Sequence, residues 1–185
     1  MNDRYSRILP AVGLATGAIL GMAGSFAPSP GLRGLAWGVD GIGIIVACAV
    51  LVIHHLQRGD TPLATGFLVF LLGETVITSA AAAPLEASGP SLAAGTGLWA
   101  AGLALVSLSP SMPRLVGASG GVAAILLAIT SLRIFGGANL TPLSQPLPFD
   151  AFPFLALTLF GWAWVAARSG YRPAVDSAPL AGYGR

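Results

Sequence analysis

Few residues of this chain can do acid–base or ion chemistry, and the most conspicuous of them lie inside apolar segments. Glu74 is the only charged residue in the stretch "GFLVFLLGETVITSAAAA" at 66–83. An acidic side chain at the centre of a membrane-spanning helix costs about 2.5–3.5 kcal/mol. The carboxyl group can lower this cost by staying protonated or by finding a partner, and Thr78 lies one turn further on the same helix face. We therefore expect Glu74 and Thr78 to turn inward, away from lipid.

Asp40 and Arg133 are the charged residues that could join this pair. At 1.5 Å of rise per residue, Asp40 would lie about 9 Å and Glu74 about 13 Å below the outer end of their spans. Arg133 is near the outer end of its own span, and an Arg side chain can reach inward or snorkel outward. Buried acids beside Arg are typical of a proton relay or a polar substrate site. We predict a substrate or ion site of Asp40, Glu74, Thr78 and Arg133; the alternatives are a structural ion pair between helices and a wrong assignment of depth.

The composition favours a membrane protein over a soluble one. Of 185 residues, 55% are hydrophobic and 9% are charged, against about 25% charged residues in a typical soluble domain. The mean hydropathy is +0.80. So few charges cannot cover a water-exposed surface, whereas a lipid bilayer removes the need for them. The net charge of +2 is too small and too dispersed to indicate a nucleic-acid partner.

Six apolar runs approach the length of about 20 residues that a membrane-crossing helix needs. Pro, Gly and Arg are frequent in the segments between them, as is typical of turns. We predict an all-α bundle of six transmembrane helices in a single membrane domain, with short loops and a short cytoplasmic tail at 168–185. The predicted spans are about 8–27, 34–56, 62–83, 91–109, 115–135 and 149–167.

The placement of Arg predicts the orientation of the bundle. With both termini in the cytoplasm (N-in/C-in), seven Arg residues fall on the inner side and two on the outer side, which follows the positive-inside rule. The inner set is Arg4, Arg7, Arg58, Arg114, Arg168, Arg172 and Arg185, and the outer set is Arg33 and Arg133. Trp162 and Trp164 would then lie at the inner interface and Trp37 near the outer one. We interpret the chain as a multi-pass protein of a bacterial plasma (inner) membrane.

The first span allows two further interpretations. It could be a cleaved secretory signal, although its apolar run is long for one and Pro28 would directly follow the cut. Gly13, Gly17 and Gly21 recur at four-residue spacing and so lie on one helix face, where small residues let helices approach closely. This ridge predicts either internal packing or a surface for a homo-oligomer or another membrane protein.

His54 and His55 are adjacent near the inner end of the second span. Neighbouring residues on a helix point about 100° apart, so the two rings cannot grip one metal ion in a compact site or ligate both faces of a haem. We therefore predict no metal and no cofactor, and we expect the histidines at the membrane interface. Motifs of hydrolases and phosphate-binding loops are missing from the sequence, so nothing indicates an enzyme or catalytic residues.

The segment "GGANLTPLSQPLPFDAFPF" at 136–154 is the most irregular part of the chain. Its proline residues favour a stiff, extended path. We expect it to cap the bundle and anchor the sixth span; alternatively, it covers a cavity near Asp40 and Glu74.

Three functions are compatible with these features. Two intramembrane acids favour a small transporter or channel-like protein with an acidic site. The short chain and the glycine ridge favour a non-catalytic subunit or assembly partner of a membrane complex. A membrane redox enzyme that uses His54 or His55 is the third.

Overall fold

The computed structural model describes residues 3–81 and 83–168, with the side chains of 3–6 and of Glu86 left aside. The described chain is helical with no strand, as the sequence predicts. The predicted tail at 168–185 lies outside the described residues except for Arg168. Two short 3-10 turns, η1 (Leu85–Ser88) and η2 (Phe149–Ala151), precede the fourth and sixth of the helices. The six helices are α1 (Asp3–Ser25), α2 (Pro30–Gln57), α3 (Thr61–Ser79), α4 (Gly89–Ser107), α5 (Arg114–Phe135) and α6 (Phe152–Arg168).

All six helices, with η2 added to α6, are long and apolar enough to cross a membrane. Local signals fix their ends. Ser29 and Asp60 cap α2 and α3 by accepting the backbone N–H groups of Leu32 and Leu63 at 3.3 and 3.4 Å, and a proline opens each helix. Helix α3 ends at Ser79, four residues before the predicted end, because the next two N–H groups turn back to Ile77 and Thr78. Ala80 and Ala81 therefore lie outside the helix.

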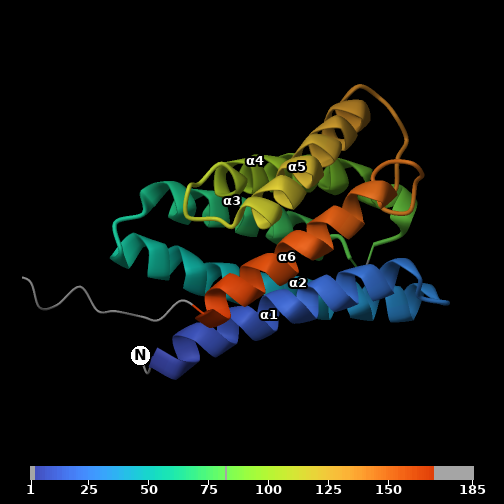
Figure 1. The fold of residues 1–185 in the computed structure, drawn as a ribbon. Coiled ribbons are helices and arrows are strands. Elements are labelled where there is room, and N and C mark those ends of the chain that lie inside the picture. Colours follow the sequence, from blue (N-terminus) through green and yellow to red (C-terminus); the bar gives the residue numbers. More distant parts are fainter. Residues whose placement is uncertain (1–2, 82, 169–185) are drawn as a thin grey trace, which may run out of the picture.

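The helices form a closed ring in the order of the sequence. Each helix packs against the next one along the chain, and α6 packs against both α5 and α1. Figure 1 shows α6 running beside α1, with the end of α6 near the start of α1. One end of the bundle carries Arg4, Arg7, Arg58, Arg114 and Arg168, and we call it the arginine-rich end. The other end, formed by the α1–α2, α3–α4 and α5–α6 connections, is the loop end.

Glycine pairs bring α3 and α4 into close contact. A Cβ atom built on Gly73 would lie 2.9 Å from the carbonyl oxygen of Gly95, and one on Gly102 would lie 2.8 Å from that of Gly66. Real Cβ atoms essentially never come within 3.0 Å of another residue. The two pairs are seven residues apart on each helix, so both lie on the facing ridges. Small residues are thus the packing device of this interface, as is common between membrane helices.

The glycine ridge of α1 packs inside the chain, against α2. A Cβ on Gly13 would meet the backbone of Gly43, and one on Gly17 would meet the side chain of Ile44. A Cβ on Gly21 would lie 3.0 Å from Oδ2 of Asp40. The absence of a side chain at position 21 therefore leaves space for the Asp40 carboxyl group.

Aromatic side chains fill the middle of the ring. Phe67 and Phe70 of α3 both contact Trp162 of α6 edge to face, with ring centroids 4.9 and 5.2 Å apart. Phe70 also stacks on Trp99 of α4 at 5.9 Å. Trp162 is 1% exposed, because its place on α6 faces the other helices. Trp164, two residues on, is exposed and carries the Arg168 guanidinium over its ring at 4.1 Å.

Candidate functional site

Asp40, Glu74 and Thr78 line one cavity at the loop end of the bundle. The cavity measures about 100 Å³ and lies between α1, α2, α3, α4 and α6. Asp40 comes from α2, ten residues after the helix begins, and Glu74 from α3, five residues before the helix ends. The two helix ends are not level with each other, because Gly41 of α2 lies beside Thr78 of α3. Glu74, one turn before Thr78, therefore lies further from the loop end than Asp40 does, in the order that the sequence predicts.

The two acids are buried and close together. Asp40 is 8% exposed and Glu74 is 3% exposed. Their carboxyl groups are near enough for their charges to interact. The close approach of α2 and α3 at this level depends on Gly41, where any Cβ would collide with the side chain of Thr78. A glycine next to Asp40 thus sets the spacing between the acids.

Thr78 is the direct hydrogen-bond partner of Glu74. Its hydroxyl group donates to Glu74 Oε1 at 3.2 Å, one helical turn away, as the sequence predicts. The other carboxyl oxygen, Oε2, is buried and makes no direct hydrogen bond to any described residue. The Trp99 side chain lies near this carboxyl group, yet its indole N–H also lacks a direct hydrogen bond within the described ranges. A buried acceptor and a buried donor therefore stand side by side at the cavity wall.

Arg133 does not join the site. Its side chain is exposed in the last turn of α5, and it is not among the residues that line the cavity. Arg33 lies elsewhere too: its guanidinium donates to the carbonyl of Ala27 at 3.4 Å and lies 6.0 Å from the ring centre of Trp37. The described residues form one ion pair within 4.0 Å, between His55 and Asp60 at the opposite end of the bundle, so neither Asp40 nor Glu74 takes part in one. The interpretation as a structural ion pair between Arg133 and the acids is therefore wrong.

Two further residues, Trp37 and Trp99, shape the cavity without any sequence signal for that role, and Pro142 lines it as the alternative interpretation of the segment 136–154 predicts. Trp37 and Trp99 both line it, and the Trp37 indole N–H is fixed by donation to the carbonyl of Gly21 at 3.1 Å. Pro142, from the long α5–α6 connection, also reaches the wall. The connection therefore contributes to the cavity, and aromatic residues of two helices flank the acids. The remaining walls are mostly apolar.

A second, smaller cavity of about 40 Å³ lies towards the arginine-rich end. Its lining includes His54, His55, Phe67 and Trp162. The aromatic cluster of Phe67, Phe70, Trp99 and Trp162 thus touches both cavities, since Trp99 lines the first and Trp162 the second. The two cavities lie on opposite sides of this cluster along the bundle.

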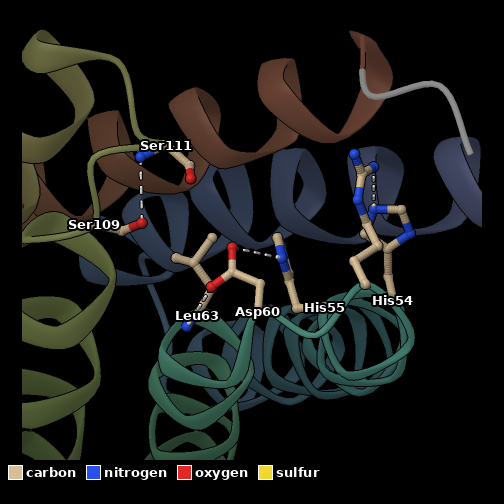
Figure 2. A network of polar contacts seen from close by, with 7 residues as sticks. His54, His55, Asp60, Leu63, Ser109 and Ser111 are labelled. Carbon is tan, nitrogen blue, oxygen red and sulfur yellow. Dashed lines mark hydrogen bonds and ion pairs between the residues drawn. The ribbon is translucent and has the colours of Figure 1, made fainter.

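The histidines of the second cavity are held by local contacts. His55 Nδ1 lies 3.8 Å from Asp60 Oδ2, and its ring stacks on Phe67 at 5.5 Å. His54 Nε2 lies 3.4 Å from a guanidinium nitrogen of Arg58. Figure 2 shows His55 facing Asp60, whose second oxygen caps α3, while His54 points in another direction. Within the described parts of the chain no three His, Cys, Asp or Glu side chains gather as a metal ion would require.

Comparison with known proteins gives no further assignment. No protein-family model, no curated protein and no solved structure matches this chain.

Proposed function

We propose that the protein is a multi-pass membrane protein with its arginine-rich end in the cytoplasm. Its six helices have the required length and apolar character. Large apolar side chains such as Val12, Ile42, Ile125 and Leu157 are exposed on the outside of the bundle, where lipid would cover them. Five described Arg residues at one end (Arg4, Arg7, Arg58, Arg114 and Arg168) against two at the other favour that end as the inner one.

We further propose that it is a small transporter or channel-like protein, in which Asp40 and Glu74 bind a proton or a small cation. The observation that carries this proposal is a pair of adjacent buried acids, in one cavity, without a basic partner among the described residues. If the two acids only held helices together, each would need a basic partner or complete hydrogen bonding to offset the cost of its burial. Ionisable groups that face a cavity inside a membrane protein are typical of ion and proton pathways.

The two cavities support transport over simple binding. One lies towards each end of the bundle, and the aromatic cluster of Phe67, Phe70, Trp99 and Trp162 separates them. Transporters commonly hold their ion near the middle of the membrane and expose it to one side at a time. In this chain, movement of the cluster would connect Glu74 first with the loop end and then with the arginine-rich end.

The test is flux in vesicles reconstituted with the purified protein. A pH-sensitive dye inside the vesicles follows proton movement, and cation gradients are imposed one at a time. We expect Glu74→Gln and Asp40→Asn to reduce flux at least tenfold, because each removes a titratable oxygen from the cavity. Asp150→Asn is the matched control, since Asp150 is exposed and does not line the cavity.

Folding is checked separately by thermal unfolding in detergent, so that loss of flux is not confused with loss of structure. Undiminished flux in a folded Glu74→Gln protein would overturn the proposal. The alternative role as a subunit of a membrane complex needs a different surface from the one the sequence favours, because α2 covers the ridge of Gly13, Gly17 and Gly21.

A further inference from the structure

The wall chemistry of the acidic cavity narrows the class of ligand that it can accept. Both charged side chains in its lining are acids, so an anion would be repelled. A divalent metal ion takes six or more oxygen ligands, or four His and Cys ligands. The described residues contain no group of three His, Cys, Asp or Glu that could hold one. A singly charged cation with its own hydrogen-bond donors fits these walls better.

The carboxyl oxygens of Glu74 and Asp40 can accept hydrogen bonds from the N–H groups of a ligand. Glu74 Oε2 is buried and makes no hydrogen bond of ordinary geometry with a described residue, and the Trp99 indole N–H near its carboxyl group leaves room for further donors. Asp40 makes no hydrogen bond or ion pair with the described part of the chain either, and its only charged neighbour of consequence is Glu74. A primary ammonium group carries three N–H donors and a single positive charge. It can bond to both carboxyl groups at once while it offsets the charge of one of them.

The rest of the cavity suits the apolar part of such a molecule. Ala18, Leu155 and Leu159 are buried apolar residues of its lining, and Trp37 and Trp99 add aromatic rings. Cations bind favourably near aromatic rings, most of all near Trp. A hydrated inorganic cation gains nothing from such apolar walls, whereas an alkyl chain is transferred from water to an apolar surface.

The volume limits the size of the ligand. The cavity measures about 100 Å³, whereas an apolar cavity of about 150 Å³ in another protein holds benzene, with its six carbon atoms. By proportion this cavity holds about four non-hydrogen atoms. Propylammonium, with three carbons and one nitrogen, has that size.

We propose that the cavity binds a small primary alkylammonium cation, with the ammonium group between Asp40 and Glu74 and the alkyl chain against the apolar wall. This assignment rests on the proposed function, because it names the cation that the acidic site would move. Thr78 keeps the Glu74 carboxyl group in place through its hydrogen bond of 3.2 Å.

The experiment uses isothermal titration of the purified full-length protein in lipid nanodiscs with propylammonium chloride. Sodium chloride, sodium propionate and tetrabutylammonium chloride serve as comparison salts. Sodium has no N–H donor, propionate has the opposite charge, and tetrabutylammonium is too large and has no N–H donor. We expect saturable binding of propylammonium alone, weakened about tenfold or more in Glu74→Gln. Asp150→Asn, which alters an exposed acid outside the cavity, should bind like the unchanged protein.

Equal heats for propylammonium and sodium, or unchanged affinity in Glu74→Gln, would overturn the proposal. If Glu74→Gln does not fold, the comparison of propylammonium with propionate and tetrabutylammonium in the unchanged protein decides it. Binding of propylammonium without any flux in vesicles would support this ligand and overturn the transport function. Proton flux that depends on Glu74 and does not change with propylammonium would support the transport function and overturn this ligand.

Discussion

The substitution Gly73→Ala tests both the packing of the bundle and the placement of the acidic site. A Cβ atom at position 73 would lie 2.9 Å from the carbonyl oxygen of Gly95, 2.9 Å from Cδ1 of Trp99 and 3.0 Å from Cβ of Leu98. Ordinary contacts of a Cβ begin at 3.4 Å. Helix α4 would have to move away from α3 by about half an ångström, because the carbonyl oxygen is part of the backbone and cannot turn aside.

The expected cost follows from this overlap. Overpacking in a close-packed interior costs about 1–3 kcal/mol, and the better helix propensity of Ala returns at most about 1 kcal/mol. We expect the free energy of unfolding to fall by about 1–2 kcal/mol, which lowers the melting temperature of a chain of this size by about 2–8 °C. The move would also shift Trp99 relative to the Glu74 carboxyl group, so flux should fall as well.

The assay is thermal unfolding of both proteins in the same detergent, followed by intrinsic fluorescence. Gly38→Ala is the matched control, because a Cβ at Gly38 in α2 meets nothing within 4 Å. Its melting temperature should stay the same or rise. Equal melting temperatures for Gly73→Ala and Gly38→Ala would refute the close α3–α4 contact and, with it, the geometry of the site.

Three other substitutions have definite expected results. Thr78→Val keeps the side-chain shape but removes the donor to Glu74, so it should cost about 1–3 kcal/mol in unfolding experiments; an unchanged stability would contradict the hydrogen bond. Trp162→Ala should cost about 3–5 kcal/mol in the same assay because it empties the centre of the ring, and a loss below about 1 kcal/mol would show that the centre is not packed as described. Arg133→Gln should leave flux in vesicles within about twofold of the unchanged protein, because Arg133 lies outside the cavity; a tenfold loss would return it to the site.

The fold could be predicted from sequence because membrane spans depend on length and apolar character alone. All six predicted spans coincide with helices. The ends were less predictable, as α3 shows: alanines 80–83 are as apolar as the helix before them, yet the chain turns after Ser79. Hydropathy does not distinguish a buried helical residue from one in a turn at the same depth.

The site could be predicted only in part. Glu74 and Thr78 are one turn apart on a single helix, so their contact follows from helix geometry and is confirmed by the hydrogen bond. Whether Asp40 meets them depends on how α2 packs on α3, which Gly41 decides and which no local pattern shows. Arg133 was misplaced because residue type and depth do not tell which face of a helix turns inward.

The packing glycines show a similar limit. The four-residue ridge of α1 was visible in the sequence, but its partner, α2, was not. Between α3 and α4 the glycines recur at seven-residue spacing, at Gly66 and Gly73 and at Gly95 and Gly102. The sequence alone therefore carries this spacing. The spacing indicates close packing only when the glycines of both helices are compared, because each pair joins one residue of α3 to one residue of α4.

We propose that a cation crosses the bundle by way of the buried carboxyl groups at positions 40 and 74. Chemical modification tests it most directly: membranes containing the unchanged protein are treated with a lipid-soluble carbodiimide, which reacts with carboxyl groups in apolar surroundings. Modified residues are identified by mass spectrometry, and flux is measured on the same vesicles. We predict modification at Glu74 or Asp40 and a loss of flux in proportion to it. A protein that is fully modified at Glu74 and still transports at the original rate would contradict the account.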